Sequence, residues 1–86
     1  MVEERTGEEQ IGNAARTSML RMARSWQTAG QINQAVDTYS RILARYPGSP
    51  EARAAADEIL ALARGYEREG RYRLALSLHD RLEQLV

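Results

Sequence analysis

Apolar residues recur every three or four positions through most of the chain, the spacing that places side chains on one face of an α-helix. Four such stretches follow one another, at about residues 8–29, 32–46, 50–69 and 72–85. The breaks between them hold Gly30, the segment 47–50 with its two Pro residues, and Gly70, and these residue types end or start helices. Strand-like alternation with a period of two does not occur over a useful length. The pattern therefore predicts an all-α fold of four helices.

Two short motifs suggest where the first and third helices begin. Thr6 precedes Glu9 by three positions, the spacing of a capping box, so we expect a helix start near residue 8 and a disordered segment over residues 1–7. Ser49 is a favoured N-cap residue, and the Pro50 and Glu51 that follow suit the first turn of a helix. We therefore expect the third helix to begin at Pro50.

The chain also repeats itself with a period of 40 over residues 10–86. Identical residues coincide when the sequence is shifted by that period: Ala14 with Ala54, Ala15 with Ala55, Leu20 with Leu60, Ala23 with Ala63, Arg24 with Arg64, Gly30 with Gly70, Ala35 with Ala75 and Arg41 with Arg81. Such a fixed period is typical of repeat architectures. We therefore divide a domain over residues 8–86 into one repeat at about 8–47 and a second at about 48–86.

The repeat resembles the tetratricopeptide repeat (TPR) family, in which bulky, small and aromatic residues precede a turn Gly, an Ala, an aromatic and a closing Pro. The first unit supplies Met19, Met22, Ala23, Trp26, Gly30, Ala35, Tyr39 and Pro47, and the second supplies Ile59, Leu62, Ala63, Tyr66, Gly70 and Ala75. This resemblance implies two stacked antiparallel helix hairpins that form a short α-solenoid. Ala23 and Ala35 are then expected where the helices of one hairpin touch.

Two features depart from the family pattern. His79 occupies the position of the usual aromatic residue, and the period of 40 exceeds the family's usual ~34. The extra residues lie between Pro47 and Ile59, which predicts a third helix longer by about one and a half turns. HEAT-type repeats, with periods of ~40–47, are the alternative, and they share the helix-pair architecture.

The residue inventory argues against catalysis. The chain has no Cys and one His, and it holds no metal-ligand spacing or phosphate-binding Gly motif. We therefore expect neither enzyme activity nor a metal or cofactor, and we interpret His79 as a packed helix residue. The lack of a signal peptide or membrane-length apolar run leads us to expect a cytoplasmic protein.

Charge separates two classes of partner. The 86 residues carry no net charge, all twelve basic residues are Arg, and residues 11–53 hold a surplus of four Arg over acidic residues. This local surplus could attract an acidic protein partner. It is weaker than the usual footprint of a nucleic-acid-binding protein, so Arg-mediated binding of nucleic acid is the alternative function.

The resemblance also implies a binding face, because the first helix of each TPR pair lines the concave groove. The corresponding residues are Leu20, Arg21, Arg24, Gln27 and Thr28 in the first repeat and Leu60, Arg64, Glu67 and Arg68 in the second. Paired Leu and Arg suit an acidic amphipathic peptide. The alternative is that the Leu residues pack against neighbouring helices and the Arg residues are merely solvated.

The last helix predicts self-association, because it carries more apolar residues than one neighbouring helix can cover. The candidates for the second surface are Leu74, Leu76, Leu85 and Val86. Repeat arrays usually need at least three units and polar end caps, whereas two units are found here. We therefore expect a homo-oligomer, with a two-fold dimer favoured.

Overall fold

The computed structural model of the chain describes the backbone of residues 2–85 and the side chains of residues 12–85. Four helices follow one another: α1 (Val2–Thr28), α2 (Ile32–Arg45), α3 (Pro50–Arg68) and α4 (Tyr72–Leu85). No strand occurs within the described backbone. The all-α prediction is therefore confirmed for this part of the chain.

The helix boundaries agree with the prediction within one residue, except at the start of α1. This helix begins at Val2, so residues 2–7, for which we expected disorder, are helical in the structure. Thr6 consequently lies inside α1 and does not cap its start. The segment contains Glu3, Glu4 and Arg5, straight-chain residues that favour a helix.

The same turn closes both hairpins. Gly30 and Gly70 have φ values of 81° and 77°, in the left-handed region where Gly has no steric penalty. In each turn the next residue donates a backbone hydrogen bond to the last turn of the preceding helix: Gln31 to the Trp26 carbonyl at 2.9 Å and Arg71 to the Tyr66 carbonyl at 2.8 Å. These bonds satisfy carbonyls at the helix C-terminus. The repeat in the sequence is thus also a repeat in backbone geometry.

The turn between the repeats is fixed by Ser49. Its hydroxyl donates to the Tyr46 carbonyl at 2.7 Å and accepts from the backbone N–H of Ala52 at 3.0 Å. Ser49 is therefore the predicted N-cap of α3, with Pro50 in the first turn. Helix α3 has 19 residues, whereas α2 and α4 have 14 each. Helix α3 is thus longer than its hairpin partner α4, as expected if the extra residues of the period lie in the third helix.

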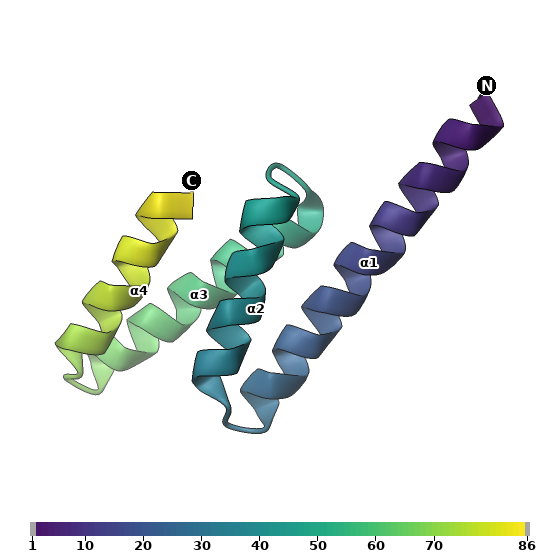
Figure 1. Ribbon diagram of the computed structural model, residues 1–86. Helices are drawn as coiled ribbons and strands as arrows, with labels where there is room; N and C mark the ends of the chain where they lie inside the picture. The colour runs from purple at the N-terminus through teal and green to yellow at the C-terminus, as the bar shows by residue number, and fades with distance from the viewer. Residues whose placement is uncertain (1, 86) are drawn as a thin grey trace.

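The helices lie side by side in chain order, as Figure 1 shows from purple α1 to yellow α4. Each helix packs mainly against its neighbours in sequence; α1 also touches α3 and α2 touches α4, whereas α1 and α4 do not meet. The Cα positions extend over 54 × 26 × 14 Å. The result is a short, elongated array of two stacked hairpins.

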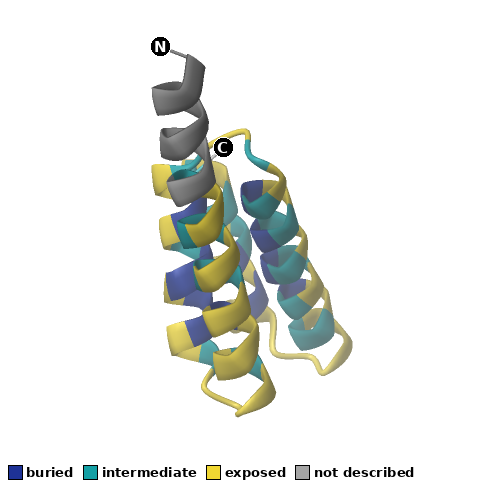
Figure 2. Ribbon diagram, turned by 90° about the vertical axis from the view of Figure 1, so that its right-hand side faces the viewer, coloured by how far each residue is buried: buried dark blue, intermediate teal, exposed yellow. Residues whose placement is uncertain are grey.

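Small buried residues allow the helices to approach closely. Ala23, Ala35, Ala63 and Ala75 are all buried, and the largest fully buried side chains are Tyr39, Ile42 and Ile59. In Figure 2 the buried residues lie where the helices face one another. The burial of Ala23 and Ala35 in one core cluster agrees with their predicted place between the helices of the first hairpin.

Three large apolar residues on the apolar helix faces are exposed, although a position on such a face favours burial. Met22, Trp26 and Tyr72 belong to the apolar stripes, yet they are 53%, 37% and 69% exposed. The reason is their position at the two ends of the array, where no described helix packs outside α1 or α4.

No helix in the described part of the chain is both long and apolar enough to span a bilayer.

Candidate interaction site

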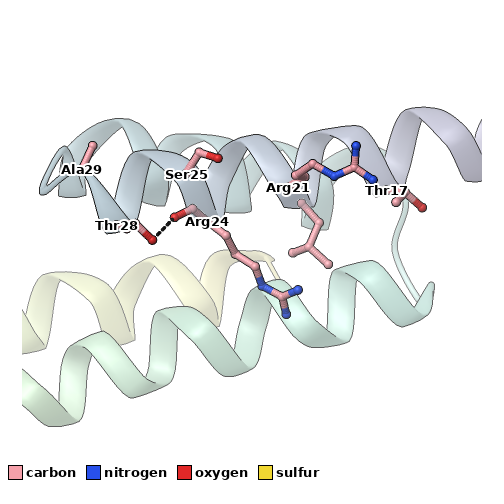
Figure 3. Close-up of a pocket in the computed structure, with 7 residues that line it drawn as sticks. Thr17, Arg21, Arg24, Ser25, Thr28 and Ala29 are labelled. Carbon is pink, nitrogen blue, oxygen red and sulfur yellow. Dashed lines mark hydrogen bonds between the residues drawn. The ribbon is translucent and has the colours of Figure 1, made fainter.

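A broad hollow of about 630 Å³ lies along one face of α1 and is drawn in Figure 3. We call it the α1 hollow; its lining residues are Thr17, Leu20, Arg21, Arg24, Ser25, Thr28 and Ala29. The structure thus brings together four of the five residues predicted for the first-repeat binding face. Thr17, Ser25 and Ala29 were missed, although their helical spacing from Arg21 and Arg24 placed them on the same face.

Two guanidinium groups dominate the chemistry of the α1 hollow. Arg24 projects from α1 on the side of α3, whereas Arg21 lies closer along α1 (Figure 3). Both side chains are exposed, and among the described side chains neither has an ion-pair partner. The Thr28 hydroxyl donates to the backbone carbonyl of Arg24 at 3.0 Å. This bond does not involve the Arg24 guanidinium, which can therefore bind a ligand. The hollow can therefore offer planar, multivalent donors to a carboxylate.

Leu20 forms part of the same surface. It is half-buried and packs against the core, and it also lines the hollow beside Arg21 and Arg24. Leu20 therefore packs as in the alternative interpretation, and its part in binding a ligand stays a prediction. An apolar edge flanked by cations suits a ligand that is itself amphipathic.

Gln27 does not line the α1 hollow. It instead accepts a hydrogen bond from the Tyr39 hydroxyl at 2.6 Å, and the same hydroxyl lies 3.2 Å from Glu58 Oε2. The bonds join α1, α2 and α3 at one buried phenol. Burial, together with the neighbouring Glu58 carboxylate, raises the pKa of Tyr39 to about 12, and the positive charge of Arg24 acts in the opposite direction. We call Gln27, Tyr39 and Glu58 the three-helix junction.

A second polar link sets α3 against α1. Arg16 Nε donates to Glu51 Oε1 at 2.8 Å, and both side chains are mostly buried. The Arg16 guanidinium also lies 5.6 Å from the centre of the Tyr46 ring, within the range of a cation–π contact. This pair was not predicted from the sequence, because its members are 35 positions apart.

The residues predicted for the second-repeat binding face do not reach the α1 hollow. Leu60 is half-buried, while Arg64 and Arg68 are exposed on α3. Glu67 is bound to His79, with 2.8 Å between Glu67 Oε1 and His79 Nε2. The structure therefore does not place the two halves of the predicted face in one cavity.

Glu67 and His79 belong instead to a separate, mostly apolar hollow on the outer side of the second hairpin. Its lining residues are Glu67, Tyr72, Ala75, Leu76 and His79, and we call it the α4 face. The interpretation of His79 as a packed helix residue holds in part, since it is half-buried.

The residues predicted for self-association have unequal exposure. Leu76 is 61% exposed and Leu74 is 41% exposed, so both are accessible. Leu85 is half-buried and packs against the core, and Val86 lies outside the described residues. Leu74 and Leu76 are therefore the stronger candidates of the four.

The inventory of potential metal ligands is sparse. Within the described residues, no three His, Cys, Asp or Glu side chains lie close enough to hold a metal ion.

Comparison with known proteins identifies the first repeat. The family model described as "Tetratricopeptide repeat" matches residues 17–49, which span the last part of α1, α2 and the turn to α3. No curated protein and no solved structure matches the chain. Between the two helix-pair families considered for the period of 40, the match favours the tetratricopeptide repeat.

Proposed function

We propose that this chain is a non-catalytic protein-interaction module, because residues 17–49 match the tetratricopeptide repeat, a repeat typical of interaction modules. In this proposal the α1 hollow binds an acidic, amphipathic peptide or protein segment, and the exposed apolar helix faces support self-association. We place its action in the cytoplasm, as expected from the sequence.

One observation carries the peptide proposal: Arg21 and Arg24 flank the apolar edge of Leu20 in a single hollow. Carboxylates of a helical or extended ligand can pair with the two guanidinium groups while its apolar residues cover Leu20. Arg64 and Arg68 on α3 are exposed as well, so a longer ligand can reach a second pair of cations. The Arg surplus of residues 11–53 favours encounter with an acidic partner.

The test is the double substitution Arg21→Glu/Arg24→Glu, which reverses the charge of the two cations that line the α1 hollow. Binding of a fluorescent peptide that alternates Glu and Leu along one helical face is measured by anisotropy. We expect the double variant to lose binding by at least tenfold, because two attractive contacts become repulsive, while circular dichroism shows unchanged helix content. The matched control is Arg41→Glu/Arg53→Glu, which alters the same net charge at two exposed residues outside the α1 hollow.

Equal affinity of both double variants for the peptide would remove the α1 hollow from the proposal. A single-stranded oligonucleotide of the same charge distinguishes the alternative partner class. Binding to it that falls steeply with salt, combined with no binding to the peptide, would identify a nucleic-acid-binding domain.

The self-association proposal rests on the exposed Leu74 and Leu76 of α4. An apolar surface of this kind is typical of an interface. Sedimentation of the wild-type chain should therefore give a mass above the 9.7 kDa monomer. A monomer at the highest soluble concentration would reject self-association and leave peptide binding unaffected.

A further inference from the structure

The two ends of the array are related to each other by the internal repeat. Adding 40 to a residue number converts α1 into α3 and α2 into α4. Helix α3 packs on α2, but no described helix packs on the corresponding side of α4. The contact between α3 and α2 therefore shows which chemistry would complete the end of the array at α4.

The residues of the α4 face are the counterparts of residues that α3 covers. Val36 is 4% exposed and Tyr39 is fully buried, and Tyr39 is bound to Glu58 of α3. Their counterparts Leu76 and His79 lie on the α4 face, where Leu76 is mostly exposed. The α4 face thus has the form of a helix-binding surface without its helix.

The chain carries a matching helix at its other end. Tyr66 of α3 shares a cavity with Ile32 and Val36 of α2, and its counterpart in α1 is Trp26. Leu62 of α3 packs against the core, and its counterpart is Met22. Met22 and Trp26 are two of the five exposed large hydrophobic residues, and together we call them the α1 outer face.

We propose that the α4 face binds the α1 outer face of a second copy, so that the chains associate head to tail and continue the solenoid. Trp26 of one copy then lies against Tyr72 and Leu76 of the next, as Tyr66 lies against Ile32 and Val36 within one chain. This inference rests on the self-association proposed above and replaces its two-fold symmetry with a heterologous contact.

The position facing His79 is also compatible with a second copy. In the first repeat Glu58 faces Tyr39, and the counterpart of Glu58 in α1 is Ser18. A Ser hydroxyl can either donate to or accept from an imidazole nitrogen. His79 can therefore keep its bond to Glu67 and gain a neutral partner without burying an additional charge.

The repeat further predicts which leucines stay outside the contact. Leu74 and Leu85 are the counterparts of Gln34 and Arg45, both exposed in the first repeat even though α3 covers α2. Leu76 is the counterpart of the buried Val36. Head-to-tail pairing thus depends on Leu76 and not on Leu74, whereas the dimer predicted from sequence used both.

Complementation between two variants tests the proposal. Leu76→Glu disables the α4 face, and Met22→Glu disables the α1 outer face. Because both residues are exposed, we expect both variants to keep the fold, which circular dichroism will verify. We expect each variant alone to sediment as a monomer, because each retains only one of the two faces needed. An equimolar mixture should form a one-to-one dimer through the two intact faces and grow no further.

The controls are Leu74→Glu and Asn13→Glu, whose positions correspond to the exposed Gln34 and Arg53; both should associate as the wild type does. Monomers in the mixture would overturn head-to-tail pairing, and so would dimers of either variant alone. If the wild type associates and only the complementation fails, self-association survives with another symmetry. A monomeric wild type removes self-association altogether.

Discussion

At the scale of single residues, the three-helix junction is the feature that sequence alone did not predict. The family pattern predicted an aromatic side chain at Tyr39, but Gln27 was assigned to the binding face. In the structure the Tyr39 hydroxyl donates to the Gln27 amide oxygen at 2.6 Å. The same hydroxyl lies 3.2 Å from Glu58 Oε2 of α3. A helical pattern defines which face a residue occupies, but it does not show which neighbour a long polar side chain selects.

Removal of that hydroxyl should destabilise the protein. Tyr39→Phe eliminates a hydrogen bond to an amide and a contact with a carboxylate, so we expect the free energy of unfolding near pH 7 to fall by about 1–3 kcal/mol. Urea denaturation will measure the change, with Tyr46→Phe as a matched control. A variant as stable as wild type would show that the junction contributes nothing to stability.

The same substitution should also alter the response to alkaline pH. The native pKa of Tyr39 is about 12, whereas an unfolded Tyr titrates near ~10, so the native state holds this proton more tightly. Its contribution to stability is complete below pH ~10 and is lost as pH rises towards about 12. The stability difference between wild type and Tyr39→Phe should therefore shrink over that interval.

At the scale of helices, sequence predicted most of the architecture. Gly30, Gly70 and the Ser49–Pro50 pair located the ends of α2, α3 and α4, because each acts through local backbone chemistry. The predicted start of α1 was wrong, because Thr6 was interpreted as an N-cap although the residues around it favour a helix. The exposure of Met22 and Trp26 was also missed, because it depends on which helix packs beside α1 and not on the pattern within it.

Close packing within each hairpin yields a prediction at this scale. Ala63 is fully buried at the contact between α3 and α4, so Ala63→Leu should force the helices apart and cost about 1–3 kcal/mol. Ala61→Leu is the control in the same helix, because Ala61 is exposed and the change leaves helix propensity almost unaltered. Thermal melts should separate the two variants, and identical melting temperatures would contradict the packing described for Ala63.

At the scale of the whole molecule, the unequal ends of the array determine how copies can meet. Trp26 is the only Trp in the chain and lies on the α1 outer face, so its fluorescence reports directly on that surface. We expect its emission to shift to shorter wavelength as protein concentration rises, because pairing removes the indole from water. Leu76→Glu should abolish the shift although Trp26 itself is intact, and emission independent of concentration would contradict the assignment of this face.

The neighbour-to-neighbour packing of the helices also has a consequence for folding. Within the described residues α1 and α4 do not touch, and each helix packs mainly against its neighbours in the chain, an arrangement that favours rapid folding. The stability of such an array is approximately a sum of terms from each hairpin and one from the interface between them. Hydrogen exchange should therefore find the amides of α4 opening more often than those of α2, which is held by helices on both sides.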